Sequence, residues 1–267
     1  MQGWIRLVSV KIGVNRIAIP AFVSLKAKEP YLCFSCFESL TSENRMKIKP
    51  WFFAMLSAWS AFSCVSQKTH APIRVACVGD SITYGRGIEE REQNSYPAQL
   101  GDCLGSGWFV ENFGVNSATL LSQGGKPYRD QPAFLQVCAF KPDVIVIMLG
   151  TNDTKQEDWQ KHHGEFVSDY MALIRSFRES SASTRIYLCK PVPIFRDRGK
   201  AWDTDKVLAE EICPAIDEVA RQMHATVIDL HTLLEGDAAM FADGVHPNAV
   251  GAAIMARAIC QSLEKGK

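Results

Sequence analysis

The fold of this chain is decided by the stretch Ile73-Arg74-Val75-Ala76-Cys77-Val78-Gly79-Asp80-Ser81-Ile82-Thr83-Tyr84-Gly85. Its apolar run from Val75 to Val78 ends at Gly79, a pattern typical of a central strand in a parallel sheet. Ligands of open α/β sheets bind beyond the carboxyl ends of the strands, and Ser81 falls at that position. Ser81 is therefore a candidate nucleophile. The alternative is that Asp80 and Ser81 only form a turn that caps the next helix.

Composition excludes some classes of function. The chain has 267 residues, of which 47% are hydrophobic and 22% charged, as expected of a globular protein with one sizeable core. Its formal net charge is zero, but the charges are unevenly distributed. Residues 1–68 carry nine Lys and Arg against three Asp and Glu, whereas the remainder carries 20 against 26. This acidic remainder has no electrostatic footprint for nucleic acid, so we expect no nucleic-acid partner.

Residues 46–66 are typical of a signal peptide. Lys47 and Lys49 precede an apolar run of about twelve residues, within the usual ~7–15 of such segments and short of the ~20 that a membrane span needs. Cleavage before Cys64 would make this cysteine the first residue of the mature protein, where it can carry a lipid. The alternative is that the segment stays uncleaved and acts as an anchor. We therefore expect an exported protein, periplasmic or extracellular, with a possible lipid anchor at Cys64.

The segment ahead of this signal, residues 1–45, shows no clear period. A signal peptide should begin at the N-terminus of a chain. We therefore expect Met46 to be the true start and residues 1–45 to be a wrongly assigned or disordered extension.

The chain after Cys64 holds six more cysteines, at positions 77, 103, 138, 189, 213 and 260. An even number in an exported protein permits disulfides, whose connectivity the sequence leaves open. Cys77 and Cys189 lie in expected strands, which favours small buried side chains at both positions.

Apolar runs alternate with helical patterns after residue 70, which predicts βαβ units and a parallel sheet. Five strands are expected, at residues 73–78, 108–112, 144–149, 185–189 and 226–229. Helices are expected at residues 96–104, 165–180, 208–224 and 248–264, with Ser95 and Asn248 as N-caps. The predicted fold class is α/β, a three-layer α/β/α sandwich with a five-stranded parallel sheet, over residues 70–267.

Four polar segments fall at strand ends or in loops. They contain Ser81, Asn112-Phe113-Gly114-Val115-Asn116, Gly150-Thr151-Asn152-Asp153 and Asp243-Gly244-Val245-His246-Pro247. The carboxyl ends of parallel strands share one edge of the sheet, so the first three should converge, and the fourth can join them from its loop.

Asp243 and His246 are three residues apart, a spacing that lets the carboxylate hold one ring nitrogen while the other faces outward. His246 could then take the proton of Ser81 and return it to a leaving group, which is general acid–base catalysis. Taken singly, Asp243 is equally consistent with a turn aspartate and His246 with a surface histidine.

Acyl transfer also needs hydrogen-bond donors for the developing oxyanion. Gly114 lets its backbone N–H approach a substrate closely. The Asn152 side-chain amide and the Ser81 backbone N–H are the other expected donors. The alternatives are a turn glycine at Gly114 and a turn asparagine at Asn152.

Taken together, these segments resemble the four sequence blocks of the SGNH/GDSL hydrolase family, in the family's order. The first block departs from the family's name, with Ile82 in place of Leu. The resemblance implies a flavodoxin-like SGNH hydrolase fold and a serine esterase with Ser81 as nucleophile, His246 as base and Asp243 as its orienter. It also implies an oxyanion hole of Ser81, Gly114 and Asn152. Asp80 and Asp153 are expected to hold their loops by local hydrogen bonds.

Other catalytic motifs fit less well. The glycines around Ser81 form neither a dinucleotide-binding nor a Walker pattern, and the Gly-x-Ser-x-Gly elbow is absent from the sequence. His162 and His163 have no partners at metal-ligand spacing, so no metal site is expected. The esterase mechanism needs no cofactor.

The substrate is inferred from the segment after the fourth strand, which contains Phe195, Arg196 and Trp202. A polar loop with aromatic residues suits a sugar ring, although an ordinary surface loop is the alternative. The sequence around Asn152 is similar to that of exported carbohydrate O-acetylesterases of the family, including sialate and xylan esterases. We therefore expect deacetylation of a glycan, with a lysophospholipase or short-chain thioesterase as the alternative. A non-catalytic glycan-binding module is a third hypothesis. The sequence leaves the oligomeric state open.

Overall fold

The computed structural model describes residues 5–12, 15–22 and 71–266. The chain divides into two compact units, Met1–Gln67 and Lys68–Lys267. In the first unit, β1 (Ile5–Ile12) and β2 (Asn15–Phe22) pair as an antiparallel hairpin. The sequence interpretation of residues 1–45 found no period, but both segments contain two isoleucines and β1 also contains two valines, residue types that favour strands. The expected signal peptide and Cys64 lie outside the described residues.

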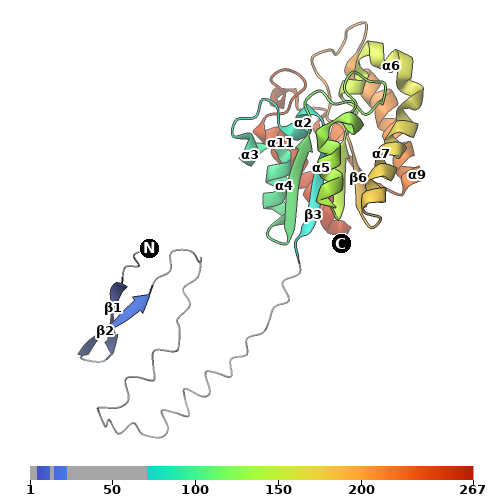
Figure 1. Cartoon of the computed structure of the whole chain (residues 1–267). Coiled ribbons are helices and arrows are strands. Elements are labelled where there is room, and N and C mark those ends of the chain that lie inside the picture. The colour runs from blue at the N-terminus through green and yellow to red at the C-terminus, as the bar shows by residue number, and fades with distance from the viewer. Residues whose placement is uncertain (1–4, 13–14, 23–70, 267) are drawn as a thin grey trace. The chain divides into compact units, whose positions relative to one another are not determined.

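The second unit contains a five-stranded parallel sheet with strand order β4-β3-β5-β6-β7. The strands are β3 (Ile73–Gly79), β4 (Trp108–Gly114), β5 (Val144–Met148), β6 (Arg185–Lys190) and β7 (Thr226–Asp229). Figure 1 shows this sheet between two layers of helices. The predicted three-layer α/β/α class is therefore confirmed, as are the positions of all five expected strands.

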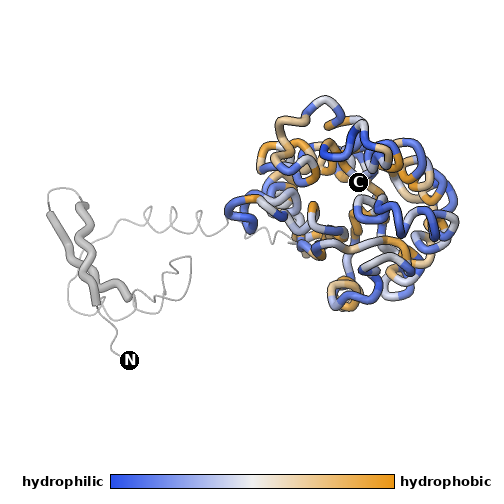
Figure 2. The backbone as a smooth tube through the Cα atoms, turned by 90° about the horizontal axis from the view of Figure 1, so that it is seen from above, coloured by the Kyte–Doolittle hydropathy of each residue, from blue (hydrophilic) through white to orange (hydrophobic). Residues whose placement is uncertain are grey.

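Alternating residues of the central strands face opposite helical layers, as the pleat of a sheet requires. Cys77 and Val146 pack with α4 (Tyr96–Leu104) and α11 (Ala249–Lys265). Their neighbours Val78 and Ile147 pack in the other core. That second layer contains α5 (Pro132–Phe140), α7 (Phe166–Ser180) and α9 (Cys213–Met223). Hydrophobic and hydrophilic residues alternate along the helices in Figure 2, as expected of helices with one buried face.

Both predicted N-caps are confirmed, and one helix differs from its prediction. Ser95 is the N-cap of α4, although its side chain makes no capping hydrogen bond, whereas Asn248 accepts from two backbone N–H groups at the start of α11. The single helix expected over residues 208–224 is interrupted. It comprises a π-helical segment η6 (Leu208–Ile212) and α9, and the short helix α8 (Thr204–Val207), which was not predicted, directly precedes it. Pro214 lacks the N–H that would continue a regular ladder, which accounts for the irregular turn before it.

Several short elements were not predicted from the sequence. The helix α5 is apolar on most of its sides, so it lacks the helical period that reveals an amphipathic helix. The other missed elements are a few residues long; they are α2 (Ser81–Tyr84), α3 (Arg91–Asn94), η3 (Tyr128–Asp130), η4 (Asn152–Thr154), α6 (Gln156–His162), η5 (His163–Glu165), α10 (Leu230–Leu234) and η7 (Ala238–Met240). Among the described residues, no helix has the length and apolar character needed to cross a membrane.

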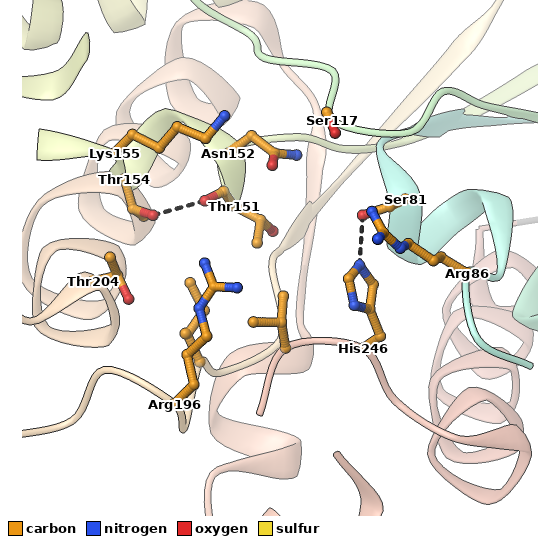
Figure 3. Close-up of a pocket in the computed structure, with 12 residues that line it drawn as sticks. Ser81, Arg86, Ser117, Thr151, Asn152, Thr154, Lys155, Arg196, Thr204 and His246 are labelled. Atoms are coloured by element: carbon orange, nitrogen blue, oxygen red, sulfur yellow. Dashed lines mark hydrogen bonds between the residues drawn. The ribbon is translucent and has the colours of Figure 1, made fainter. Parts of the chain in front are cut away.

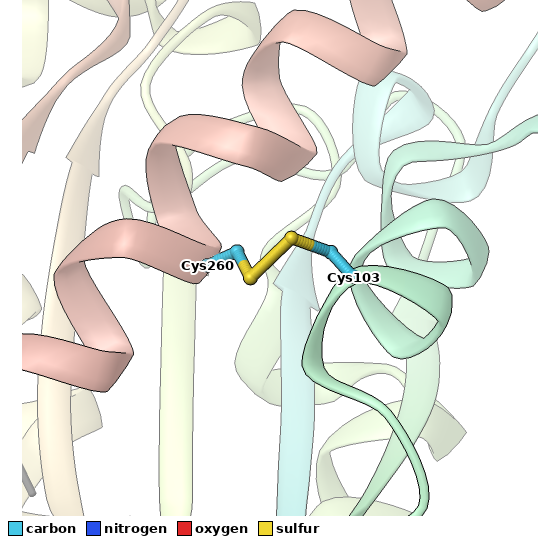
Figure 4. The surroundings of a disulfide bond; sticks show 2 residues. All are labelled: Cys103 and Cys260. Atoms are coloured by element: carbon cyan, nitrogen blue, oxygen red, sulfur yellow. A yellow bond between two sulfur atoms is a disulfide. The ribbon is translucent and has the colours of Figure 1, made fainter.

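A disulfide joins Cys103 of α4 to Cys260 of α11, as Figure 4 shows. This pairing resolves part of the connectivity that the sequence left open. It links two neighbouring helices of one layer across 157 residues of sequence, so it closes a loop that contains most of the sheet. Cys77 and Cys189 are fully buried in β3 and β6, as expected from their strands.

Gly114, the last residue of β4, lies against the backbone of α2. A Cβ at this position would collide with the Tyr84 backbone nitrogen and lie 2.7 Å from the Thr83 carbonyl carbon. Neither atom can move without displacing the helix that begins at Ser81. We expect Gly114→Ala to lower the free energy of unfolding by about 3 kcal/mol, the upper end of overpacking costs, as measured by chemical denaturation.

Gly107→Ala is the matched control for this prediction. A Cβ at Gly107 meets no atom within 4 Å, so this substitution is expected to change stability little. Equal unfolding free energies for the two variants would contradict the close approach of β4 to α2.

Candidate active site

Ser81 lies at the carboxyl end of β3, as the first residue of the short helix α2. Asp80 is the N-cap of this helix, and its Oδ1 accepts a hydrogen bond from the Ile82 N–H at 2.8 Å. The side chain of Ser81 is mostly buried, with 6% of the residue exposed. The strand, the cap and the helix therefore fix the direction in which the hydroxyl of Ser81 points.

His246 and Asp243 reach Ser81 from the loop before α11. The Ser81 Oγ lies 2.8 Å from the His246 Nε2, and the His246 Nδ1 lies 2.6 Å from the Asp243 Oδ2. An ionised carboxylate can only accept hydrogen bonds, so the Nδ1 carries the ring proton and the Nε2 accepts from the hydroxyl. This is the arrangement in which a serine can transfer its proton to a histidine (Figure 3).

The Asp243 carboxylate is held in its ionised form. Partial burial acts to raise its pKa, but hydrogen bonds from the His246 backbone, the His246 ring and the Val245 N–H outweigh burial and lower the pKa to about 2. The Oδ1 of Asp243 accepts both backbone N–H groups, at 2.9 Å from Val245 and 2.8 Å from His246. The same side chain thus shapes the loop and orients the imidazole.

Asp80, Asn152 and Asp153 connect the segments around Ser81. The Asn152 Nδ2 donates to the Ala118 carbonyl at 3.0 Å and contacts the Asp80 Oδ2 at a longer 3.4 Å. Asp153 does not act locally, contrary to the expectation from the sequence. Its two oxygens accept the backbone N–H groups of Leu120 and Leu121, more than 30 residues earlier in the chain. It therefore ties the loop after β5 to the loop after β4.

Burial changes the acidity of two of these carboxyl groups. It raises the pKa of Asp80 to about 7 and that of Asp153 to about 6. Repulsion between the two carboxylates also acts to raise the pKa of Asp80. Both groups therefore titrate close to neutral pH, next to the loops that carry Ser81 and Asn152.

The structure does not present Gly114 as the expected oxyanion donor. Strand β4 continues two residues beyond its predicted end, and the Gly114 N–H donates to the Asn112 Oδ1 at 2.9 Å. Gly114 is also absent from the described lining of the pocket at Ser81, whereas Ser117 is part of that lining. Ser117 has a φ of 65°, and its N–H has no hydrogen-bond partner among the described residues. Ser117 takes the place in the pocket that was predicted for Gly114.

The pocket beside Ser81 is small and is lined mainly by residues with polar side chains. Its volume is about 210 Å³, and only Ile194 and Val245 among its described lining residues are apolar. Ser81, Asn152 and His246 line it together, so the structure gathers three of the predicted catalytic and oxyanion-hole residues at one cavity. A pocket of this kind suits a small acyl group on a polar alcohol better than a long hydrocarbon chain.

Of the three residues expected in a substrate loop, only Arg196 lines the pocket. The ring of Phe195 packs on Phe241, with 5.0 Å between ring centroids. The Trp202 Nε1 donates to the Thr154 carbonyl at 2.9 Å, and its side chain packs against the hydrophobic core. The two aromatic residues therefore support the loop from within and do not line the pocket at Ser81, and their contact with substrate stays a prediction.

The described lining also includes residues that the sequence analysis did not single out, namely Arg86, Ser117, Thr151, Thr154, Lys155 and Thr204. Thr151 belongs to the Asn152 segment, Thr154 and Lys155 directly follow it, and Arg86 lies five residues after Ser81. Closeness to the motifs was their only signal in the sequence. Among the residues that the structure describes, no cluster of three or more His, Cys, Asp or Glu side chains could hold a metal ion.

Comparison with known families gives a match over most of this unit. Residues 77–254 match the model of the GDSL-like lipase/acylhydrolase family. The chain is also 42% identical over 211 residues to an acetylxylan esterase from Xylanibacter ruminicola. That alignment covers 72% of this chain and 43% of the relative, so the chain spans less than half the length of that protein.

Solved structures with less than 25% identity share the fold. An inhibitor-bound aryl esterase from M. smegmatis has a TM-score of 0.61 at 18% identity, covering 72% of this chain and 99% of that one. A carbohydrate acetylesterase from Sinorhizobium meliloti has a TM-score of 0.56 at 18% identity, covering 73% and 100%. A catalytic mutant of an acetylxylan esterase from Geobacillus stearothermophilus has a TM-score of 0.52 at 23% identity, covering 72% and 94%.

Proposed function

Since the chain belongs to the GDSL-like lipase/acylhydrolase family of ester hydrolases, we propose that it removes O-acetyl groups from a carbohydrate, with Ser81 as the nucleophile. The observation that carries this proposal is the continuous hydrogen-bonded line from Ser81 through His246 to Asp243, with distances of 2.8 and 2.6 Å, at the edge of a small polar pocket. The similarity to an acetylxylan esterase supports the acetyl ester as the bond that is cleaved.

In the first half of the reaction, the Ser81 Oγ attacks the ester carbonyl carbon while its proton passes to the His246 Nε2. The Asp243 carboxylate stabilises the resulting imidazolium. Collapse of the tetrahedral intermediate breaks the bond to the sugar oxygen, which leaves as an alcohol with the proton from His246. In the second half, water attacks the acetyl-Ser81 ester with His246 again as base, and acetate leaves.

The negative charge on the tetrahedral intermediate needs donors. We assign the backbone N–H groups of Ser81 and Ser117 and the side-chain amide of Asn152 to this role. The Ser81 N–H is the first of α2 and has no acceptor within the helix, and the Ser117 N–H has no partner among the described residues. The longer 3.4 Å contact of Asn152 with Asp80 leaves one amide proton available to turn toward an oxyanion. Loss of one such donor costs roughly 10²–10³ in turnover.

The small pocket predicts a preference for short acyl groups. We expect the full-length protein to hydrolyse p-nitrophenyl acetate with a kcat/KM at least about tenfold above that for p-nitrophenyl octanoate, because only Ile194 and Val245 offer apolar contact in the described lining. Release of p-nitrophenol from each ester, followed by release of acetate from acetylated xylo-oligosaccharides, measures this preference.

The outcomes of this experiment separate the alternatives. A faster reaction with octanoate would replace the carbohydrate proposal with a lipid esterase or thioesterase. Binding of a glycan without turnover of any ester would support a non-catalytic module. Export of the protein, which the signal-like segment at residues 46–66 predicts, is part of the same proposal.

A further inference from the structure

Three basic side chains surround the pocket at Ser81. They are Arg86, Lys155 and Arg196, which come from three different segments of the chain. In Figure 3 the guanidinium group of Arg196 extends toward Thr151, and Lys155 lies above it. The described residues that line the pocket include no Asp or Glu. The pocket therefore presents positive charge from several sides.

These charges are incompletely neutralised by the rest of the described structure. Among the described residues, Arg86 and Lys155 have neither an ion pair nor a side-chain hydrogen bond. The Arg196 Nε lies 3.3 Å from the Asp197 Oδ2, but Asp197 also binds the Lys200 Nζ at 2.6 Å. One carboxylate is thus shared by two cations, and the terminal nitrogens of Arg196 remain available for a ligand.

The concentration of positive charge contrasts with the composition of the rest of this unit. Residues 69–267 carry 20 Lys and Arg against 26 Asp and Glu, so the unit is acidic as a whole. Neither solubility nor folding requires three cations around one small cavity. A pocket lined by one sign of charge instead raises the local concentration of ligands of the opposite sign.

Arg196 is fixed next to the residues that are proposed to react. The Gly244 carbonyl, between Asp243 and His246, accepts the Phe195 N–H at 2.7 Å and the Arg196 N–H at 3.4 Å. This docking holds the base of the Arg196 side chain beside the loop of His246. A planar guanidinium placed in this way matches the geometry of a carboxylate, which it can bind with two parallel hydrogen bonds.

We propose that the acetyl ester is carried by a saccharide with a carboxylate, such as a uronic acid, and that Arg196 binds this carboxylate during deacetylation, while Lys155 and Arg86 add to the positive charge that attracts it. The inference rests on the proposed function, because it assigns the substrate class of the same site. A phosphate group could also bind these cations. The pocket, however, is small and has only two apolar residues in its described lining, so it has little room for the long acyl chain of a phospholipid.

A matched pair of substrates tests the proposal with the full-length protein. The pair is an O-acetyl methyl glucuronoside and the corresponding O-acetyl methyl glucoside, which differ only in the carboxylate. We expect the kcat/KM of the wild type to be about tenfold higher for the glucuronoside than for the glucoside. This ratio corresponds to a free-energy difference of about 1.4 kcal/mol. The preference should fall with rising salt, since ions screen charges that water can reach. Arg196→Gln and Lys155→Gln are each expected to bring the ratio of the two kcat/KM values closer to one.

Arg221→Gln is the control variant, because Arg221 is an exposed cation on α9 paired with Glu218 and should leave the ratio unchanged. Equal kcat/KM values for the pair in the wild type would overturn the inference while leaving the esterase in place. Absence of turnover of both sugars and of p-nitrophenyl acetate would instead overturn the proposed function as well. Acetyl glycerol phosphate is the third substrate, and a preference for it over the glucuronoside would assign the cations to a phosphate.

Discussion

Ser81→Ala is expected to lower kcat for p-nitrophenyl acetate by at least about 10⁴-fold, because no other group in the proposed mechanism can form the acyl-enzyme. Within the described part of the chain, the Ser81 Oγ makes its one hydrogen bond with His246, 2.8 Å away, so its removal leaves the imidazole without a nucleophile to activate. The loss should appear in kcat more than in KM, since the hydroxyl is used chiefly in the transition state. Steady-state rates at saturating ester measure it.

The control for this prediction is Ser122→Ala. Ser122 is exposed and lies outside the described lining of the pocket, so this variant is expected to keep the wild-type rate. Ser81 is mostly buried in a compact region, so the melting temperature of Ser81→Ala should be compared with that of the wild type. A well-folded Ser81→Ala protein with more than about one per cent of wild-type kcat would contradict the assignment.

Asp243→Asn is expected to lower kcat by roughly 10²–10⁴-fold through the tautomer of His246. The side-chain oxygen of the introduced asparagine can still accept the backbone N–H groups of Val245 and His246, so the loop should keep its shape. The amide nitrogen of the same side chain would then face the His246 Nδ1 and donate to it. This would move the ring proton to the Nε2, where the ring can no longer accept from Ser81. Steady-state kinetics and a thermal melt separate this chemical effect from unfolding.

The low pKa of Asp243 predicts a second measurable effect of Asp243→Asn, on the pH dependence of stability. A carboxylate with a lowered pKa stabilises the folded state above its unfolded pKa, near 3.9, and this contribution is lost as pH falls toward about 2. Acidification from pH 5 to pH 3 should therefore destabilise the wild type more than Asp243→Asn in urea denaturation. Asp130→Asn, at an exposed aspartate, is the matched control for both measurements. Similar kcat values for Asp243→Asn and Asp130→Asn would exclude Asp243 as the residue that orients His246.

Much of the site could be predicted because a parallel sheet brings the residues that follow its strands to one edge. The strands that precede Ser81 and Asn152 are apolar over most of their length, so their ends are visible in the sequence. Neighbouring parallel strands end at the same edge of the sheet, which brings these residues together regardless of the conformation of the loops. The pair Asp243 and His246 could be recognised because the contact between them is local.

The oxyanion donor after β4 could not be predicted in the same way. A glycine suggests close approach of the backbone, and Gly114 does approach closely, but it approaches α2 and not the pocket. The difference comes from two more residues of strand than the sequence indicated, which place the Gly114 N–H on the Asn112 side chain. The left-handed conformation of Ser117 has no signature in its residue type, because serine rarely adopts it.

The walls of the pocket were predicted least well. Aromatic residues in a loop beside a site can stack on a sugar or anchor the loop, and the sequence cannot distinguish the two. In the structure Phe195 and Trp202 anchor the loop, while the neighbouring Arg196 reaches the cavity. Which side chain of such a loop faces substrate depends on tertiary contacts with distant residues, such as the Thr154 carbonyl that accepts from Trp202.

The most direct test of the mechanism is to locate the covalent bond that it requires. The full-length wild-type protein would be treated with a fluorophosphonate, which reacts with activated serines, then digested and mapped by tandem mass spectrometry. We predict a single adduct on Ser81, formed in step with the loss of esterase activity and absent from Ser81→Ala. Loss of activity with the adduct on a different residue, or full activity after complete modification of Ser81, would contradict the assignment of Ser81 as the nucleophile.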